Sequence, residues 1–121
     1  DMNILVLGLS FKENTDDVRE SPALTIIPKL RNSLNKIYLH DPIARDNFKK
    51  ELGNFEELKY INNWESYIKS CHIILILTNW LEYKKLENMN LEDKFIIDPR
   101  RILNKKIIKV KGYYTVGQKN K

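Results

Sequence analysis

This sequence alternates short apolar runs with helix-like segments, and that alternation leaves few folds open. Runs rich in Ile, Leu and Val occur at residues 3–7, 36–40, 71–77 and 95–97, with weaker ones at 58–61, 107–110 and 113–116. Strands of a parallel sheet are continuous apolar runs because crossover helices cover both faces of the sheet. We therefore predict an α/β fold: a doubly wound, Rossmann-like domain with a mostly parallel sheet and helices on both faces.

Helix signals fill the gaps between these runs. Ser21 can cap a helix that starts at Pro22, because the serine oxygen accepts a backbone N–H and proline needs no donor at the first position. Pro28 removes a helical hydrogen bond at a cost of about 3 kcal/mol, so we expect a kink or an early end there. Further helices are predicted at about 42–52, where Gly53 stops the helix, at 64–70 and at about 80–86.

The length of 121 residues suits a single domain spanning residues 1–121 and is too short for a two-domain enzyme. The net charge of +5 is unevenly distributed, since residues 1–99 carry 13 Lys and Arg against 16 Asp and Glu, whereas residues 100–121 carry eight Lys and Arg and no acid. This basic tail reflects either an A/T-rich coding sequence or selection for an anionic partner. Aromatic and basic residues do not interleave in a nucleic-acid-binding motif, so we expect no nucleic-acid partner.

Other classes of protein are excluded by what the sequence lacks. No apolar run approaches the roughly 20 residues of a membrane span, and the first residues lack the basic start of a leader peptide. We expect a soluble, cytoplasmic domain without a membrane partner, and Asp1 before Met2 suggests a piece of a longer protein. Cys71 is the only cysteine and has no zinc-ligand spacing with His40 and His72, so we expect no disulfide and no metal site.

Cys71 and the two histidines are expected to be structural. Cys71 opens the most apolar run, with no cation or base obviously beside it to stabilise a thiolate, so we predict a buried, unreactive thiol. His40 and His72 are expected to pack at strand ends rather than to act as ligands or bases. Trp64 and Tyr83 are predicted core residues.

Three polar segments follow predicted strands, at residues 8–21, 78–80 and 98–101. Ligands of doubly wound sheets bind beyond the carboxyl ends of the strands, so we expect these segments to form one crevice. Trp80 is expected to pack in the core, and the alternative is that it borders this crevice. Lys12 lies in the first segment, and Arg100 and Arg101 lie in the third. Together these cations would suit a diphosphate or a sugar phosphate. The alternative is that both arginines face water as part of the basic tail.

The first segment lacks the turn that holds a dinucleotide. That turn reads G-x-G-x-x-G, whereas only Gly8 is present here, and about 13 residues separate the strand from the helix instead of the usual two to six. We therefore expect that this segment alone does not bind the pyrophosphate of NAD in the usual way. Loops of this length are commonly functional, although a solvated loop with an internal pair of Asp17 and Arg19 is an alternative.

A phosphate-accepting receiver domain shares this order of elements. It would need paired acids directly after the first strand and a lysine after the fifth. Gly8, Leu9 and Ser10 occupy the first of these places and Arg100 with Arg101 the second. The sequence therefore disfavours a receiver domain.

The first polar segment resembles a known family. Residues 8–12, Gly-Leu-Ser-Phe-Lys, and residues 15–23, Thr-Asp-Asp-Val-Arg-Glu-Ser-Pro-Ala, closely resemble the opening of the C-terminal domain in the UDP-glucose and GDP-mannose dehydrogenase family. Further matches follow in order at Asp41 with Pro42, Thr78 with Trp80, and Asp98 with Arg100. The resemblance runs from about residue 3 to residue 117. It departs from the family pattern at Glu13, at Asn79, where an acid is usual, and at Pro99.

This resemblance implies the substrate-binding part of an NAD-dependent nucleotide-sugar 6-dehydrogenase. Such an oxidoreductase converts the sugar C6 alcohol to a carboxylate, of the UDP-glucose to UDP-glucuronate type, in polysaccharide biosynthesis. NAD and the catalytic residues would then lie mainly outside this chain, which alone would be inactive, and the intact enzyme would be a homodimer through a central region.

The resemblance also implies roles for three residues. Phe11 and Lys12 would form the edge of the pocket for a nucleotide sugar such as UDP-glucose. Arg100 would hydrogen-bond on the sugar or cofactor side of the cleft. The alternative function is a free-standing nucleotide-sugar or anion-binding module without redox activity.

Overall fold

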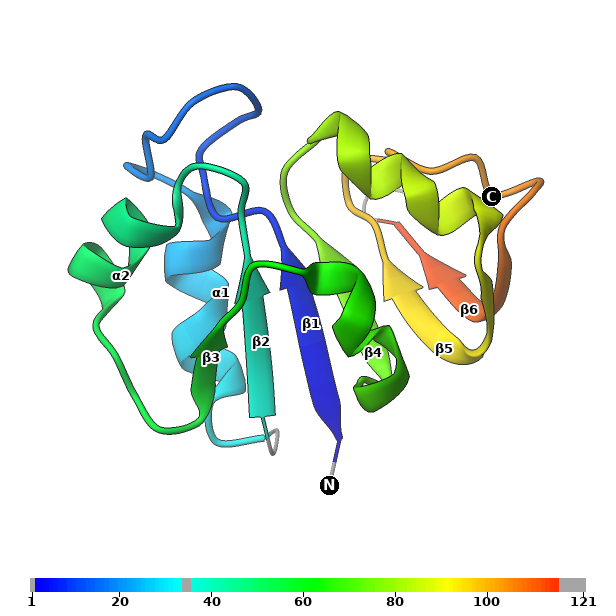
Figure 1. Cartoon of the computed structure of the whole chain (residues 1–121), viewed down its shortest axis with the longest axis horizontal. Coiled ribbons are helices and arrows are strands. Elements are labelled where there is room, and N and C mark those ends of the chain that lie inside the picture. Colours follow the sequence, from blue (N-terminus) through cyan, green and yellow to red (C-terminus); the bar gives the residue numbers. More distant parts are fainter. Residues whose placement is uncertain (1, 34–35, 116–121) are drawn as a thin grey trace.

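Six parallel strands form one sheet in the order β3-β2-β1-β4-β5-β6. The computed structural model describes residues 2–33 and 36–115. The strands are β1 Asn3–Leu7, β2 Lys36–His40, β3 Leu58–Tyr60, β4 Ile73–Ile76, β5 Asn90–Ile97 and β6 Lys109–Tyr114. The α-helices are α1 Pro22–Leu30 and α2 Arg45–Leu52, and the 3₁₀ helices are η1 Trp64–Ser70 and η2 Leu81–Asn88. Figure 1 shows the loops after β1, β2, β4 and β5 at the same edge of the sheet.

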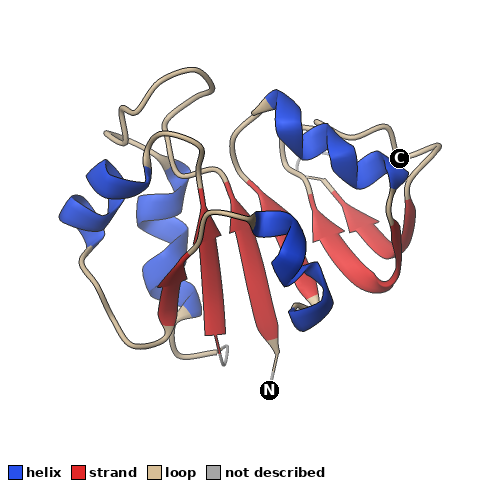
Figure 2. Ribbon diagram, viewed as in Figure 1, coloured by secondary structure: helices blue, strands red, loops and turns tan. Residues whose placement is uncertain are grey.

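The predicted doubly wound α/β fold is confirmed. Figure 2 shows helices on both faces of the twisted sheet, and alternate residues of β1 enter two separate cores. Leu5 and Leu7 pack with residues of η1 and η2, whereas Ile4 and Val6 pack with residues of α1 and α2. Both faces of the strand are therefore buried, which explains why its sequence is uniformly apolar.

Some predicted boundaries are wrong for identifiable reasons. β5 begins at Asn90 rather than at residue 95, because β6 pairs with its polar first half across an irregularity between Leu91 and Phe95. The runs predicted at 107–110 and 113–116 form the single strand β6, and residue 116 lies outside the described residues. α1 passes through Pro28 and ends two residues later, at Leu30.

α2 starts at Arg45, later than predicted, and residues 42–44 form a turn that Asp41 caps. Asp41 is 5% exposed and follows β2 directly. Its Oδ1 accepts hydrogen bonds from the backbone N–H groups of Ile43 (3.0 Å) and Ala44 (2.8 Å), which form a turn in place of the first helical residues. Its Oδ2 accepts from the backbone N–H groups of Leu9 (2.8 Å) and Ser10 (3.1 Å). One carboxylate thus joins the end of β2 to the loop after β1.

Gly8 allows the ends of β1 and β4 to meet. Its φ is +106°, a conformation that other residues rarely adopt. A Cβ built on Gly8 would lie 2.5 Å from the backbone N and side-chain atoms of Thr78. Thr78 in turn donates a hydrogen bond from its Oγ1 to the Ser10 carbonyl (3.1 Å). The single glycine of the loop therefore serves strand packing.

Replacing Asp41 should destabilise the fold. In Asp41→Asn one carboxylate oxygen becomes an amide donor facing backbone N–H groups, so at least two backbone donors lose their acceptor, one or more of them buried. At about 1–3 kcal/mol for each unsatisfied group, the free energy of unfolding should fall by about 2–5 kcal/mol in urea denaturation. The control Asp46→Asn changes a side chain that is 83% exposed and should shift it by less than about 1 kcal/mol. Equal effects of the two substitutions would contradict this role of Asp41.

His40 should make stability pH dependent. Its ring is buried against Trp64 and Tyr83, with Nδ1 2.9 Å from the Tyr83 hydroxyl oxygen. Burial lowers the pKa of His40 below its usual 6.5, although the carboxylates of Glu82 and Asp41 act in the opposite direction.

The unfolded chain therefore binds more protons than the folded chain below about pH 6.5, and the free energy of unfolding should fall as the pH drops through this range. An NMR titration should find the imidazole of His40 still neutral at pH 6.5. A midpoint at or above 6.5 would contradict the assignment.

Candidate functional site

The three polar segments predicted to form a crevice are joined by hydrogen bonds at the carboxyl edge of the sheet. The Thr78 hydroxyl reaches the first segment at Ser10, as described above. The indole Nε1 of Trp80 donates to Asp41 Oδ2 over 3.1 Å, and the Arg100 guanidinium donates to the Phe11 carbonyl over 3.3 Å. β1 and β4 are neighbours in the sheet. After β1 the chain continues to α1 on one face of the sheet, and after β4 it continues to η2 on the other face. This is where doubly wound sheets bind ligands.

The loop of residues 8–21 is held by its own hydrogen bonds. The backbone N–H of Phe11 donates to the Asp17 carbonyl (2.7 Å), and the Ser10 hydroxyl donates to the Lys12 carbonyl (2.7 Å). The predicted pair of Asp17 and Arg19 is present at 2.8 Å, and its hydrogen bonds lower the pKa of Asp17 to about 2. Hydrogen bonds within the loop therefore hold the backbone at Phe11 and Lys12 in place.

Phe11 and Lys12 lie on the outside of this loop. The Phe11 side chain is 41% exposed, although its backbone is hydrogen-bonded on both sides. Lys12 is also exposed, and within the described residues its ammonium has no hydrogen bond or ion pair. An apolar ring and a cation are thus available to a ligand next to Arg100.

Asp98 holds the segment that carries Arg100. The Asp98 side chain is fully buried. It accepts hydrogen bonds from the backbone N–H groups of Ile102 (3.0 Å) and Leu103 (2.9 Å) and from the Tyr113 hydroxyl (2.6 Å). Arg100 is exposed and turns back to the first loop. Asp98 therefore acts on the segment after β5 as Asp41 acts on the segment after β2.

Of the three predicted site residues, Arg100 is hydrogen-bonded to the Phe11 carbonyl, and Lys12 follows Phe11 in the same loop. Sequence reasoning did not predict the structural roles of Asp41, Asp98 and Tyr113. The available signal was an Asp-Pro pair directly after each of two strands, since an aspartate there can accept the backbone donors of the following turn.

Cys71 and His72 lie away from the carboxyl edge, because they precede β4 at the opposite edge of the sheet. Burial raises the pKa of the Cys71 thiol to about 11, which agrees with the predicted unreactive thiol. The expectation that no cation stands beside it is wrong, because the buried Lys94 ammonium donates to the Cys71 carbonyl over 2.7 Å. Sequence reasoning missed this contact because it forms between β5 and the turn before β4.

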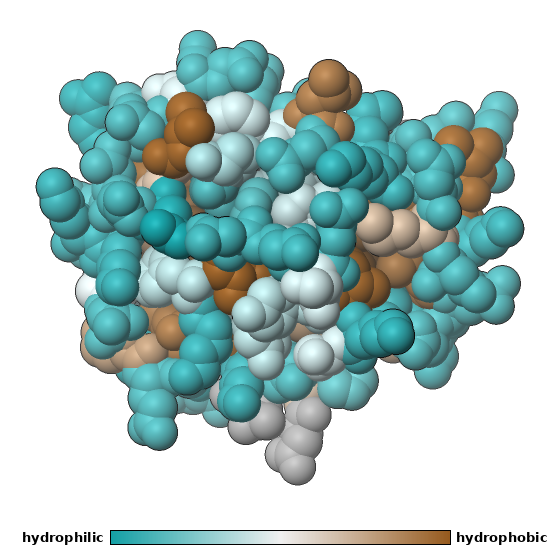
Figure 3. Space-filling view, in the orientation of Figure 1, coloured by the Kyte–Doolittle hydropathy of each residue, from teal (hydrophilic) through white to brown (hydrophobic). Residues whose placement is uncertain are grey.

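The carboxyl edge of the sheet combines polar loops with three exposed apolar residues, Phe11, Ile43 and Leu81. The face shown in Figure 3 is mostly hydrophilic, with apolar patches that are small and separate. Residues 2–33 and 36–115 contain no group of three or more His, Cys, Asp or Glu residues that could hold a metal ion. Nor does this part of the chain contain a helix with the length and apolar character needed to span a membrane. The exposed groups at the carboxyl edge include the cations of Lys12 and Arg100 and the aromatic ring of Phe11.

Comparisons with known proteins agree with this geometry. The family model described as "UDP-glucose/GDP-mannose dehydrogenase family, UDP binding domain" matches residues 5–105. The UDP-glucose 6-dehydrogenase of Rickettsia felis is 42% identical over 123 residues, which cover 97% of this chain and 27% of that protein. The UDP-glucose 6-dehydrogenase TuaD of Bacillus subtilis is 37% identical, over 95% of this chain and 26% of that protein. The chain thus spans about a quarter of the length of these curated relatives.

Solved structures support the same conclusion. A UDP-glucose dehydrogenase from the hyperthermophilic archaeon Pyrobaculum islandicum superposes with a TM-score of 0.77 at 31% identity, over 93% of this chain and 24% of that one. A GDP-mannose dehydrogenase from Pseudomonas aeruginosa shares the fold, with a TM-score of 0.68 at 18% identity over 93% of this chain and 27% of that one. The chain therefore belongs to the UDP-glucose/GDP-mannose dehydrogenase family, of which it is the UDP binding domain.

Proposed function

We propose that the crevice at the carboxyl edge binds the diphosphate and sugar of a UDP-sugar, with Phe11, Lys12 and Arg100 as its contact residues. The observation that carries this proposal is the hydrogen bond from Arg100 to the Phe11 carbonyl, which places a guanidinium beside the loop that presents Lys12. A guanidinium binds phosphate oxygens or paired hydroxyls with two parallel hydrogen bonds, and an ammonium adds a mobile positive charge.

The backbone of the crevice is fixed before any ligand arrives. Asp41 and Asp98 each satisfy several buried donors, and Thr78 ties the first loop to the end of β4. Only exposed side chains then have to move when a ligand binds, which limits the entropic cost of binding.

The residues of this chain do not fit the pyrophosphate of NAD in the usual way. The loop after β1 has a single glycine, and the space that this glycine leaves is filled by Thr78. The α1 helix begins only at Pro22, after the long loop. We therefore infer that NAD, the oxidant of the reaction, is held mainly by parts of the longer protein outside this chain, with Arg100 as a contact on the cofactor side.

In that longer protein we propose an NAD-dependent 6-dehydrogenase that oxidises the C6 alcohol of UDP-glucose to a carboxylate. The UDP-glucose 6-dehydrogenases to which the chain is similar support this reaction class. The described residues contribute binding and orientation, and the catalytic groups belong elsewhere. We further propose that the longer protein is a cytoplasmic homodimer and that its product is used in polysaccharide biosynthesis.

Binding of UDP to the 121-residue chain tests the site. Lys12→Gln and Arg100→Gln should each weaken UDP binding about tenfold in calorimetry or NMR titration, because each removes a charge-assisted hydrogen bond. Lys29→Gln removes an exposed cation from the last turn of α1 and is the matched control. A control that weakens binding as much as the two site variants would show that only net charge matters. Unchanged affinity in both site variants would reject the assignment.

Turnover of the longer enzyme tests the proposed reaction. Lys12→Ala in the intact protein should lower kcat/KM for UDP-glucose by at least about tenfold, while the melting temperature stays within about 2 °C because the side chain is solvent exposed. Wild-type kcat/KM in this variant would contradict the role of Lys12. A protein that binds UDP-glucose but never reduces NAD would instead favour a binding module.

A further inference from the structure

Ser10 connects the buried part of the carboxyl edge to the exposed Lys12. The serine is fully buried, and each of its polar groups is hydrogen-bonded. Its backbone N–H donates to Asp41 Oδ2 (3.1 Å), and its carbonyl accepts from the Thr78 hydroxyl (3.1 Å). Its own hydroxyl donates to the Lys12 carbonyl over 2.7 Å, a distance typical of a well-formed O–H···O bond. Ser10 is therefore fixed from the ends of β2 and β4 and in turn holds Lys12.

The bond from Ser10 is the contact that holds the backbone of Lys12. Lys12 is exposed, and among residues 2–33 and 36–115 its carbonyl makes no other hydrogen bond. Its ammonium and its backbone N–H have no partner in this part of the chain. Without the Ser10 hydroxyl, the backbone at Lys12 would be free to sample other conformations, and the ammonium on its flexible side chain would move with it.

Phe11 is held by other contacts. Its N–H donates to the Asp17 carbonyl over 2.7 Å, and its carbonyl accepts from Arg100 over 3.3 Å. Neither bond involves the Ser10 hydroxyl. Loss of that hydroxyl should therefore release Lys12 and leave the neighbouring Phe11 in place, which a general loosening of the loop would not do.

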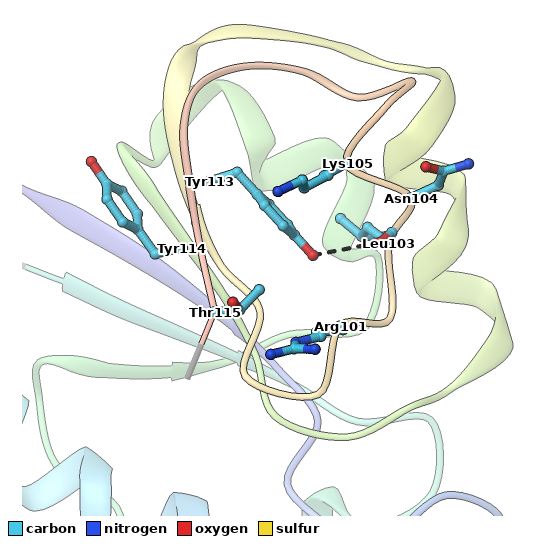
Figure 4. A pocket seen from close by; sticks show the side chains of 7 residues that line it. All are labelled: Arg101, Leu103, Asn104, Lys105, Tyr113, Tyr114 and Thr115. Carbon is cyan, nitrogen blue, oxygen red and sulfur yellow. Dashed lines mark hydrogen bonds between the residues drawn. The ribbon is translucent and has the colours of Figure 1, made fainter. Parts of the chain in front are cut away.

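The segment that carries Arg100 is also held independently of Ser10. The Tyr113 hydroxyl lies 2.6 Å from Asp98 Oδ2 and 3.4 Å from the Leu103 carbonyl. Figure 4 shows the Tyr113 ring pointing toward Leu103. The backbone N–H of Leu103 donates to Asp98 as well (2.9 Å). The Ser10 hydroxyl has no part in these bonds, so a variant of Arg100 can serve as a reference for effects of Ser10.

We propose that Ser10 is a positioning residue of the UDP-sugar site, whose hydroxyl fixes the backbone from which the Lys12 ammonium reaches the diphosphate. The inference rests on the function proposed above, because it requires Lys12 to contact the ligand. Ser10 itself is fully buried and acts through Lys12. A fixed backbone also removes part of the entropic cost of ordering Lys12 when the ligand binds.

Calorimetry of UDP binding to Ser10→Ala, at low salt, measures the contribution of the hydroxyl. The affinity should fall about fivefold, because Lys12 must then be ordered on binding. Ser66→Ala is the matched control, since it removes another serine hydroxyl that donates to a backbone carbonyl, that of Asn63 (2.9 Å). The control should leave UDP affinity unchanged. Wild-type affinity in Ser10→Ala, or an equal loss in Ser66→Ala, would overturn the proposal.

A double-mutant cycle shows whether Ser10 acts through Lys12. In the Lys12→Ala background, Ser10→Ala should cause no further loss of affinity, because the ammonium that it positions is already absent. In the Arg100→Gln background, Ser10→Ala should still weaken UDP binding about fivefold. Equal further losses in the two backgrounds would overturn the proposal, because they would mean that the hydroxyl supports the whole loop.

The backbone dynamics of the free chain give a second readout, which requires no ligand. The Lys12 carbonyl shares a peptide plane with the Glu13 amide. In Ser10→Ala the {¹H}–¹⁵N NOE should fall at the amides of Lys12 and Glu13 and keep its wild-type value at Phe11. An unchanged NOE at Lys12 and Glu13 would overturn the proposal.

Ser10→Cys is a second variant, for use if the alanine variant does not fold. Its side chain fills the same buried space, and a thiol donates only weakly. Ser10→Cys should therefore also weaken UDP binding and lower the NOE at Lys12. Wild-type values of both quantities in this variant would overturn the proposal.

Two outcomes separate this proposal from the function on which it rests. If the wild-type chain and Ser10→Ala bind UDP equally while Lys12→Ala binds it more weakly, the UDP site stands and the role of Ser10 is overturned. If the wild-type chain does not bind UDP, both proposals are overturned.

Discussion

The carboxylate of Asp41 is the interaction on which the carboxyl edge of this domain depends. It accepts four backbone N–H groups, two from the loop after β1 and two from the turn after β2, and also the indole N–H of Trp80 after β4. Three chain segments that are distant in sequence thereby share one buried anion. Without it, buried donors at the ends of two strands would lack acceptors, a cost comparable to a large part of the stability of a small domain.

This arrangement separates structural from binding groups. The buried carboxylates of Asp41 and Asp98 satisfy backbone donors and are not available to a ligand, whereas the cations of Lys12 and Arg100 are exposed. Several hydrogen bonds inside the fold occupy the oxygens of both carboxylates, which leaves ligand binding to the exposed cations. The carboxyl edge accordingly combines a hydrogen-bonded backbone with positively charged side chains, which suits the binding of an anion more than bond making.

Local and long-range interactions explain which features could be predicted. β1 and β2 were predicted at their observed residues because both faces of each strand are largely buried, and burial leaves an apolar run in the sequence. The first half of β5 escaped prediction because its polar residues pair with β6 at the edge of the sheet. The contacts of Asp98 with Tyr113 and of Lys94 with Cys71 join residues far apart in sequence, so no local pattern reveals them. Lys12 and Arg100 were proposed as site residues from their positions after strands and from the resemblance to a family, whereas Phe11 was proposed from the resemblance alone.

The central claim is that the UDP diphosphate lies at the edge organised by Asp41. The position of a paramagnetic Mn²⁺ ion chelated by bound UDP measures this directly. Mn²⁺ chelated by the diphosphate broadens the signals of amides close to it, and Mn²⁺ alone provides the reference. The excess broadening should be strongest at the amides of Phe11, Lys12 and Arg100. Strongest broadening at Cys71 and His72, on the opposite edge of the sheet, would contradict the account.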